Sequence, residues 1–313
     1  PWEIRRLREI ARPGVVVITN VSAAHLMTLR TVEDVAMAKG EILEEMAEDG
    51  WAVLNRDDPR VYAMRDRVRG RVMTFGLAKG ADVTAKEIHT GEDGTRFRLK
   101  HGGEEAEARL NIPGLHQVSN ALAAAAAALV LGRPLSVIAN GLSSYKSLAQ
   151  RWETFSLSNG AVVINDAYNA NPESMKAAIR TVEGLGHGRR NIAVLGDMLE
   201  LGGFSEEAHR AMGRLVAESS FDILITVGEH AAWISEEAEN KGMKPKGIFR
   251  YRSWGDAVLK LREILDGNDR ILLKASRRME LERIAEELKK AGVISQKEMR
   301  SKKESKMKDQ KAK

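Results

Sequence analysis

The chain has 313 residues, of which 43% are hydrophobic, and it contains no cysteine. This length predicts two domains, and the lack of cysteine excludes a disulfide framework and thiol catalysis and is compatible with a reducing compartment. Because no run of about 18 uncharged apolar residues occurs and no signal peptide is recognisable at the start, we expect a soluble, cytoplasmic protein without stable membrane insertion.

The formal net charge of +5 is concentrated at the C-terminal end, because the segment 297–313 alone carries this excess. A charge-rich segment with few apolar residues cannot bury enough surface to become ordered. We therefore expect a basic disordered tail over 296–313. Transient contact of this tail with an anionic membrane or with RNA is the alternative, but the balanced charge of the remaining chain predicts no nucleic-acid partner.

The first part of the chain mixes helical and strand-like patterns. A helix is expected over 4–11, and strands over 14–19 and 51–54 flank a helix over 32–47, which indicates a parallel sheet. An Ala-rich helix over 120–131 follows later. Between them, short alternating segments separated by Gly- and Asp-bearing turns predict an antiparallel patch attached to the larger sheet. These segments span residues 72–75, 82–89, 96–100 and 107–110.

The second part alternates regularly between strand and helix patterns, which predicts a doubly wound, largely parallel sheet. The expected strands span residues 161–165, 191–195, 223–227, 247–251 and 270–274. The expected helices span residues 174–183, 205–219, 229–240, 254–265 and 279–291. We therefore expect an α/β protein with one domain over 1–148, which contains a mixed sheet, and a Rossmann-like domain over 149–295.

Polar residues follow the apolar strand that ends at residue 165. The string 166–172 (Asp-Ala-Tyr-Asn-Ala-Asn-Pro) presents Asp166, Asn169 and Asn171 at a strand's carboxyl end, where open α/β sheets bind nucleotides or acyl substrates. An Asx-rich turn in which Pro172 begins the next helix is the structural alternative.

Two residues of the first domain suggest a metal or phosphate site. His25 lies just beyond the strand 14–19 and could bind a metal or a phosphate, with a structural hydrogen-bonding role as the alternative. Thr31 and Asp34 have the spacing of a capping box, which places Lys39 on the apolar side of the following helix. A buried stem with the ammonium group reaching water is the ordinary interpretation of such a lysine.

These strings resemble those of the Mur ligase family. The string 166–172 is similar to the signature of its MurF branch, which adds D-alanyl-D-alanine to a cell-wall precursor. Residues 114–122 resemble the family's GxHNxxNALAA, with Gln117 in place of the first Asn. Residues 194–202 resemble its GDMxELG loop and are followed by His209, and residues 274–282 resemble its KGSRxMxxE motif, with Ala in place of Gly. The matches run in family order through both expected domains.

The resemblance implies a central ATPase domain, N-terminally truncated, over 1–148 and a C-terminal ligase domain over 149–295. It implies ATP and Mg²⁺ as cofactors, and UDP-N-acetylmuramoyl-tripeptide and D-alanyl-D-alanine as partners that an amide-forming ligase joins through an acyl phosphate in peptidoglycan precursor synthesis. It also implies that Lys39 is carbamylated and binds magnesium, with His25 as a second metal or phosphate ligand. Desolvation would favour the neutral amine that this modification needs.

The resemblance assigns further residues to the substrates. The catalytic set is Lys39, His25 and Arg151, and the nucleotide set is His116, Asn120, Arg151, Asp166, Asn169 and Asn171. The acceptor set is Asp197, His209, Lys274, Ser276 and Arg277. The structural alternatives are that His116 and Asn120 only cap their helix, that Arg151 forms an interdomain salt bridge, and that the segment 274–278 is a solvated basic turn.

One element of the family is missing, because no Gly-Lys-Ser or Gly-Lys-Thr occurs in the sequence. Such a phosphate-binding loop supplies much of the charge neutralisation for ATP, and the family's N-terminal UDP-binding domain has no counterpart either. We therefore expect a monomeric fragment, or a shortened relative, that is inactive alone. The alternatives are a non-catalytic binding module and another ligase of the superfamily, such as the diaminopimelate- or lysine-adding enzyme or folylpolyglutamate synthase.

Overall fold

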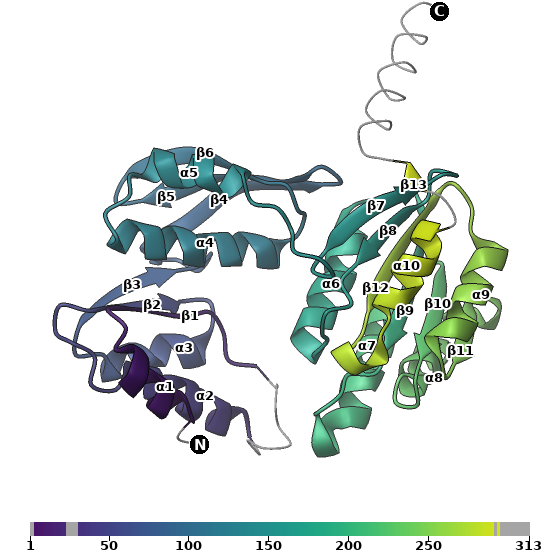
Figure 1. Ribbon diagram of the computed structural model, residues 1–313, viewed down its shortest axis with the longest axis horizontal. Coiled ribbons are helices and arrows are strands. Elements are labelled where there is room, and N and C mark those ends of the chain that lie inside the picture. Colours follow the sequence, from purple (N-terminus) through teal and green to yellow (C-terminus); the bar gives the residue numbers. More distant parts are fainter. Residues whose placement is uncertain (1–2, 23–30, 291–292, 295–313) are drawn as a thin grey trace, which may run out of the picture. The chain divides into compact units, whose positions relative to one another are not determined.

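The computed structural model describes residues 3–22, 31–290 and 293–294. The chain forms two compact units, the first comprising Pro1–Lys146 with Glu200–Gly202 and the second Ser147–Leu199 with Gly203–Lys313 (Figure 1). His25 and the basic tail lie outside the described residues. None of the helices in the described part is both long and apolar enough to cross a membrane.

The first unit contains a six-stranded mixed sheet with its strands in sequence order. Its first four strands pair in parallel and its last three pair antiparallel. The strands are β1 (Val15–Ile18), β2 (Trp51–Asn55), β3 (Arg71–Phe75), β4 (Val83–Gly91), β5 (Gly94–His101) and β6 (Glu104–Leu110). The prediction that 72–75 belongs to the antiparallel patch is wrong. β3 pairs in parallel with β2, because the helical connection between them crosses over and returns the chain in the same direction.

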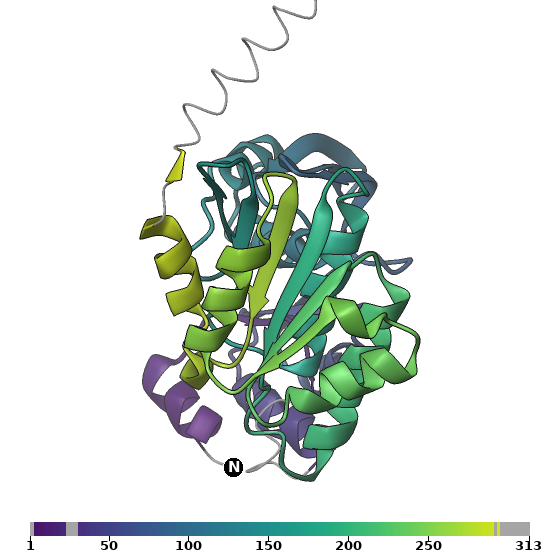
Figure 2. The ribbon, with the colours of Figure 1, turned by 90° about the vertical axis from the view of Figure 1, so that its right-hand side faces the viewer.

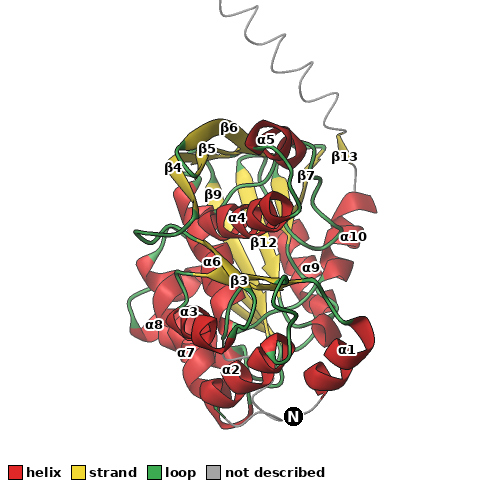
Figure 3. Cartoon of the chain, turned by 90° about the vertical axis from the view of Figure 1, so that its left-hand side faces the viewer, coloured by secondary structure: helices red, strands yellow, loops and turns green. Residues whose placement is uncertain are grey.

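The helices of the first unit are α1 (Glu3–Ala11), α2 (Val32–Gly40), α3 (Pro59–Ala63), α4 (Leu115–Val130) and α5 (Leu135–Ser143), with short 3₁₀ turns η1 (Glu41–Leu43) and η2 (Met64–Arg67). Figure 3 shows α4 and α5 in red beside the yellow strands β4, β5 and β6. The helix expected over 32–47 ends at Gly40 and continues as η1. The sequence interpretation missed α3, although Asp58 and Pro59 supply its N-cap and first residue.

The second unit contains a seven-stranded sheet in the order β11-β10-β9-β12-β8-β7-β13. Five strands that follow one another in this order pair in parallel, which confirms the largely parallel, doubly wound prediction: β8 (Val162–Asn165), β9 (Arg190–Gly196), β10 (Ile223–Val227), β11 (Ile248–Tyr251) and β12 (Asp269–Lys274). The unpredicted strands β7 (Glu153–Leu157) and β13 (Val293–Ile294) extend the edge in antiparallel pairing. Figure 2 shows the parallel strands of this sheet, in teal to yellow-green, side by side with helices along them.

The helices of the second unit are α6 (Pro172–Gly184), α7 (Ser205–Glu218), α8 (Ala232–Asn240), α9 (Trp254–Ile264) and α10 (Glu282–Lys290), with 3₁₀ turns η3 (Gly202–Phe204), η4 (Pro245–Gly247) and η5 (Arg277–Met279). α9 and α10 pack on the sheet in one apolar cluster, whereas α6, α7 and α8 pack against one another. Every residue of β12 is buried, as in strands covered on both faces. Because β8, β12, β9 and β10 pair in parallel, their carboxyl ends lie at the same edge of the sheet, where polar loops follow.

Candidate functional site

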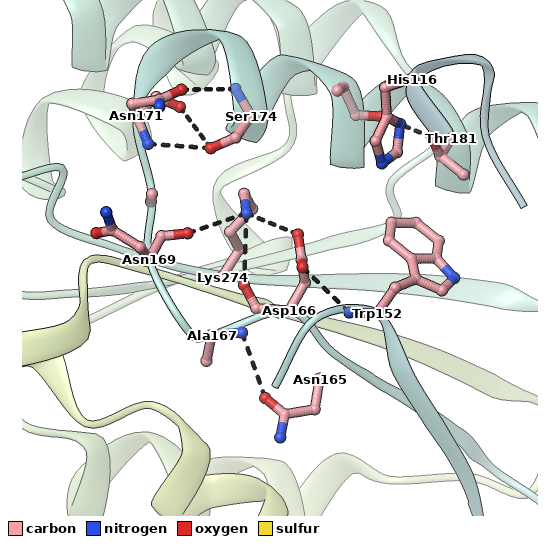
Figure 4. Close-up of polar contacts among 12 residues, drawn as sticks. His116, Trp152, Asn165, Asp166, Ala167, Asn169, Asn171, Ser174, Thr181 and Lys274 are labelled. Carbon is pink, nitrogen blue, oxygen red and sulfur yellow. Dashed lines mark hydrogen bonds and ion pairs between the residues drawn. The ribbon is translucent and has the colours of Figure 1, made fainter. Parts of the chain in front are cut away.

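Asp166 and Lys274 form an ion pair at this edge, in which the lysine is buried and the carboxylate partly exposed (Figure 4). Asp166 follows β8 and Lys274 ends the adjacent strand β12. The Lys274 Nζ lies 2.6 Å from Oδ2 of Asp166 and donates to the main-chain oxygens of Asn169 at 3.2 Å and Asp166 at 3.4 Å. The Lys274 side chain is only 3% exposed. Its ammonium protons are therefore directed at acceptors of the protein itself.

The turn containing Arg151 is fastened to the loop that follows β8. The main-chain N–H of Trp152 donates to Oδ1 of Asp166 at 3.1 Å, and that of Tyr168 donates to the Gln150 carbonyl at 3.0 Å. Gln150 and Trp152 have φ angles of +61° and +59°, a left-handed backbone that costs about 1–3 kcal/mol for such residues. Trp152 is 2% exposed and anchors the turn, so Arg151 is held at its tip.

Arg151 stacks on the exposed ring of Tyr168, with its guanidinium carbon 4.0 Å from the ring centroid. The guanidinium of Arg277 lies 5.5 Å from the same centroid, but it also donates to the Gln150 side chain and pairs with Glu282 at 3.6 Å. Within the described residues, Arg151 makes no side-chain hydrogen bond or ion pair. Its planar set of N–H donors is therefore available to an anion.

The two asparagines of the 166–172 string differ in their surroundings. The Asn171 side chain caps α6 by accepting from the Ser174 N–H at 2.8 Å, and the Ser174 hydroxyl accepts from the Asn171 N–H at 3.0 Å. These reciprocal bonds appear in Figure 4. The main-chain oxygen of Asn169 accepts a hydrogen bond from Lys274, and the residue is exposed to solvent. Asn171 thus fits the capping role of an Asx turn, and Asn169 keeps its amide toward solvent.

Asp197 follows β9 and is buried against the loop that follows β10. Its Oδ1 accepts from the Ala231 N–H at 2.6 Å. Gly228 lies so close that an added Cβ would come within 2.3 Å of the same oxygen, and its φ of +121° also favours glycine. The carboxylate therefore holds the turn 228–231 against β9, and only glycine fits beside it.

Ser276 connects three loops at the carboxyl edge. Its N–H donates to the Asp197 carbonyl at 3.0 Å, and its hydroxyl accepts from the Leu199 N–H at 2.8 Å and donates to the Ala170 carbonyl at 3.3 Å. The preceding Ala275 has no positive φ angle and is fully buried. Alanine can therefore stand at position 275 in place of the family's glycine, because this position does not use the left-handed backbone.

His209 on α7 is fully buried, and both of its ring nitrogens face main-chain groups. Nε2 accepts from the Met198 N–H at 2.9 Å, and Nδ1 lies 2.6 Å from the Ser205 carbonyl, to which it donates. Burial lowers the pKa of His209, opposed by the nearby Asp197 charge. The ring is therefore neutral, with its proton on Nδ1, and fixes the loop after β9.

Lys39 in the first unit is held less completely. Its Nζ donates to the main-chain oxygen of Asn20, just beyond β1, at 2.7 Å. Burial lowers the pKa of Lys39, and the charge of Asp58 opposes the shift. Asp58 itself caps α3 and accepts from the Val21 N–H at 2.6 Å. The ammonium of Lys39 thus ends on a carbonyl group at the end of β1.

His116 and Asn120 lie in the first turns of α4. The residue that precedes this helix is Gly114, which makes no side-chain capping bond, so the interpretation that His116 and Asn120 cap the helix is wrong. Gln117 lies between them, 3.0 Å from the His116 Nε2 and 3.5 Å from the Asn120 Nδ2. The longer amide that replaces the family's asparagine therefore contacts both of these predicted nucleotide-binding residues.

No cluster of three or more His, Cys, Asp or Glu side chains suited to a metal ion occurs in the described residues. Lys39 as an ammonium ion cannot ligate a metal, whereas a carbamate on the same nitrogen would supply oxygen ligands of the kind that Mg²⁺ prefers. The predicted partner His25 lies outside the described residues. The donor set fits magnesium only in the modified form of Lys39.

The structure brings together Arg151, Asp166, Asn169, Lys274 and Arg277 around one loop of the second unit. Sequence reasoning missed the ring of Tyr168 and the turn at Gln150 and Trp152, on which this arrangement depends. Tyr168 could have been singled out as the one aromatic residue among the polar residues of the 166–172 string. Nothing in the sequence indicates the left-handed turn, because neither of its two left-handed residues is glycine or asparagine.

Comparison with known protein families agrees with this architecture. The Mur ligase middle domain matches residues 2–128, and the Mur ligase, glutamate ligase domain matches residues 150–277. The first match lies within the first unit, and the second lies within the second unit except for Glu200–Gly202. The chain therefore belongs to the Mur ligase family.

The similar curated proteins come from one branch of that family. The chain is 36% identical over 287 residues to the UDP-N-acetylmuramoyl-tripeptide–D-alanyl-D-alanine ligase of Bacillus subtilis, covering 91% of this chain and 61% of that protein. It is 30% identical over 295 residues to the ligase of the same name from Escherichia coli, covering 93% and 63%. The chain thus spans about three fifths of the length of these relatives.

Solved structures give the same result. A crystal structure of MurF from Acinetobacter baumannii superimposes with a TM-score of 0.82 at 29% identity, covering 91% of this chain and 61% of the other. MurF ligase from Thermotoga maritima, determined in complex with ADP, superimposes with a TM-score of 0.79 at 28% identity, covering 93% and 65%. The fold is that of MurF over the shared length.

Proposed function

We propose that this chain supplies the middle and ligase domains of an ATP-dependent ligase that adds D-alanyl-D-alanine to UDP-N-acetylmuramoyl-tripeptide. The curated relatives with this name match more than nine tenths of the chain in continuous order. The observation that carries the proposal is the Arg151 turn, where a strained backbone, an ion pair and the Tyr168 ring together present a guanidinium that makes no hydrogen bond or ion pair within the described residues. Such strain is typical of functional sites.

The nucleotide part of the proposal divides the residues into two groups. Arg151 has free donors for phosphoryl oxygens, and Asn169 and Asn120 have exposed amides. Asp166 keeps a partly exposed carboxylate, 19% accessible, that can accept from ribose hydroxyls while it holds Trp152 and Lys274. The remaining predicted nucleotide residues, His116 and Asn171, act through their neighbours: His116 through Gln117 and Asn171 as the cap of α6.

Magnesium enters the proposal through Lys39. When bound, the ion supplies charge neutralisation for the phosphate oxygens of ATP. Lys39 would hold it in the carbamate form, and His25 is the second proposed ligand. The lowered pKa of Lys39 favours the neutral amine that reacts with carbon dioxide.

For the acceptor side we propose that Arg277 faces the substrates, because its side chain is 55% exposed. A guanidinium suits a peptide carboxylate. Asp197, His209, Lys274 and Ser276 are buried and bonded to main-chain or side-chain groups of the protein. We therefore assign these four to shaping the loops of the acceptor site.

The proposed reaction has two steps. The terminal carboxylate of the tripeptide attacks the γ-phosphate of ATP, which releases ADP and leaves an acyl phosphate. The amine of D-alanyl-D-alanine then attacks the acyl carbon, and phosphate and a proton leave as the tetrahedral intermediate collapses to an amide. Arg151 would stabilise the charge that spreads over phosphoryl oxygens in the first step, and exclusion of water protects the acyl phosphate.

The test uses this chain alone and the same chain preceded by the N-terminal segment of the B. subtilis relative that it does not cover. The measurement is phosphate release from ATP that depends on both UDP-tripeptide and D-alanyl-D-alanine, with the UDP-pentapeptide identified by mass spectrometry. We expect the chimera to form the product and Arg151→Ala in it to reduce turnover by about a hundredfold. Arg133→Ala, at an exposed arginine of the first unit, is the matched control.

Two outcomes count against the proposal. A folded chimera that forms no pentapeptide, under conditions in which the intact B. subtilis enzyme does, would favour a non-catalytic module. Product formation with another amine acceptor and not with D-alanyl-D-alanine would assign the chain to a different branch of the family. Activity of the chain alone would contradict the expectation that these 313 residues are inactive by themselves.

A further inference from the structure

We propose that Tyr168 is a positioning residue, which holds the Arg151 guanidinium in place for the phosphate oxygens of a bound nucleotide. The inference rests on the proposed function and adds a residue to it. Arg151 is the guanidinium at the tip of the 150–152 turn, and its only described side-chain contact is the Tyr168 ring, at 4.0 Å. A cation held over an aromatic face keeps its N–H edge open to a second ligand.

The backbone around Arg151 is arranged to make this contact. The Tyr168 N–H bonds to the Gln150 carbonyl on one side of Arg151, and the Trp152 N–H bonds to Asp166 on the other. Both bonds join the same two loops, so the ring of Tyr168 and the base of the Arg151 side chain are fixed relative to each other. The left-handed residues on either side of Arg151 show that this turn is held in an otherwise unfavourable conformation.

A second tyrosine between two arginines shows what a purely structural cluster looks like. In the first unit, Tyr62 lies 4.4 Å from the guanidinium of Arg56 and 4.0 Å from that of Arg65. There Arg56 donates to the Tyr62 hydroxyl at 2.6 Å and to the Lys79 carbonyl at 3.0 Å, and Arg65 donates to the Tyr62 carbonyl at 3.1 Å. These two arginines donate hydrogen bonds to groups of the protein, whereas the Arg151 side chain donates none to any residue that the structure describes.

The ligand chemistry follows from the free donors. A guanidinium with an open edge binds paired oxyanions, as in a diphosphate. Arg277, the other arginine near Tyr168, is directed toward Gln150 and Glu282, so Arg151 is the guanidinium left for the ligand. Tyr168 does not need to touch the nucleotide to matter, because it fixes the position of the group that does.

The first experiment measures the contact without any ligand. The Arg151 Nε–H proton of the full chain is observed by NMR and assigned by its disappearance in Arg151→Lys. We expect a ring-current upfield shift in the wild type and in Tyr168→Phe, and its loss in Tyr168→Leu. Tyr62→Leu, which removes the ring from the comparison cluster, should leave the Arg151 signal in place.

The second experiment titrates the full chain with ADP and determines the dissociation constant. Tyr168→Leu should weaken binding about fivefold, whereas Tyr168→Phe and Tyr62→Leu should stay within about twofold of the wild type. In an Arg151→Ala background Tyr168→Leu should have no further effect, because the ring acts only through the guanidinium. A general structural role for Tyr168 would instead add to the loss. Thermal unfolding confirms that each variant is folded.

The outcomes separate the inference from the proposed function. Absence of the ring-current shift, or unchanged ADP binding by Tyr168→Leu when Arg151→Ala weakens it, overturns the positioning role and leaves the function untouched. Unchanged binding by Arg151→Ala, or no saturable ADP binding by the wild type, overturns the nucleotide assignment of Arg151. Perturbation of the Arg151 signal by D-alanyl-D-alanine and not by ADP overturns it as well, in favour of a substrate carboxylate.

Discussion

Lys274 and Lys39 are both predicted site lysines that end near the carboxyl ends of parallel strands, yet their surroundings differ. Lys274 is buried, paired with Asp166, and bonded to two main-chain oxygens. Lys39 is half-buried, donates to the Asn20 carbonyl, and has a lowered pKa because of burial. The first is a charged support of the fold. The second is an amine whose charged form burial disfavours.

The difference extends to the two sheets. At the carboxyl edge of the second unit, buried polar side chains such as Asp197, His209 and Ser276 bond to neighbouring loops. They define where the few open groups, Arg151 above all, are presented. In the first unit, Lys39 makes a single hydrogen bond, to the Asn20 carbonyl, and no ion pair within the described residues. Residues that a motif groups together thus divide into those whose side chains bond to neighbouring loops and those whose side chains do not.

The largest effect should come from breaking the buried pair. Lys274→Met leaves the Asp166 carboxylate without its cation, and removing one partner of a buried pair costs about 3 kcal/mol in the free energy of unfolding. Urea denaturation measures this loss. Lys241→Met, at an exposed lysine, is the matched control and should change stability by less than about 0.5 kcal/mol.

A second variant separates charge from packing at the same position. Adding Asp166→Asn to Lys274→Met removes the unpaired charge and should recover part of the loss. A loss below about 1 kcal/mol in Lys274→Met alone would contradict the view of Lys274 as a support. Lys274 would then contribute little to the stability of the fold, and its contrast with Lys39 would no longer hold.

His209 should give the next largest effect. His209→Leu leaves the buried Met198 N–H without an acceptor, which costs about 2 kcal/mol. Because the pKa of His209 is lowered in the folded state, the unfolded chain takes up the proton at higher pH. Stability is therefore full above the unfolded value of 6.5 and falls as the pH drops from there toward the folded pKa.

The control for this pH dependence is a variant that keeps the hydrogen bonds but cannot titrate. His209→Gln retains a donor and an acceptor, so urea midpoints between pH 5 and pH 8 should show a smaller slope than the wild type. His187→Gln, at an exposed histidine, should leave the slope unchanged. Equal slopes in all three proteins would mean that the buried imidazole does not carry the effect.

The helix starts that flank the two lysine sites should give smaller losses. Thr31 begins α2, which carries Lys39, and Asn171 begins α6, both with reciprocal capping boxes. Thr31→Ala and Asn171→Ala should each cost about 1 kcal/mol in urea denaturation. Asn171→Asp retains the cap and should retain stability. If Asn171→Asp is as unstable as Asn171→Ala, the amide does more than cap the helix.

The sequence was sufficient for the order of most long elements and for most of the second sheet, because strand and helix periods alternate there with clear turns. It failed at β3, whose partner depends on a crossover helix too short for its periodicity to be recognised. It also failed at β7, a strand on the edge of the sheet. Pairing partners depend on distant residues, which local patterns do not encode.

For the candidate site, the sequence identified residue types and positions but not which atoms remain free. Lys274 and Arg277 belong to one motif, yet one is buried and the other is exposed. Tyr168 and the left-handed turn at Gln150 and Trp152 were not predicted, because their roles depend on main-chain bonds between two loops. Which side-chain atoms remain free of partners depends on contacts between distant parts of the folded chain.

The smallest change in stability is expected at Lys39, where it is the most informative. Lys39→Met removes one hydrogen bond and also one partly desolvated charge, so the free energy of unfolding should change by less than about 0.5 kcal/mol. With ¹³C-labelled bicarbonate, we expect a carbamate signal in the ¹³C NMR spectrum of the wild type. Lys39→Met should abolish this signal, whereas Lys241→Met should retain it. An anion beside the Asn20 carbonyl and Asp58 needs a cation nearby, so Mg²⁺ should strengthen the signal. A carbamate signal that persists in Lys39→Met would show that another amine is modified. Lys39 and Lys274 would then differ only in how deeply they are buried.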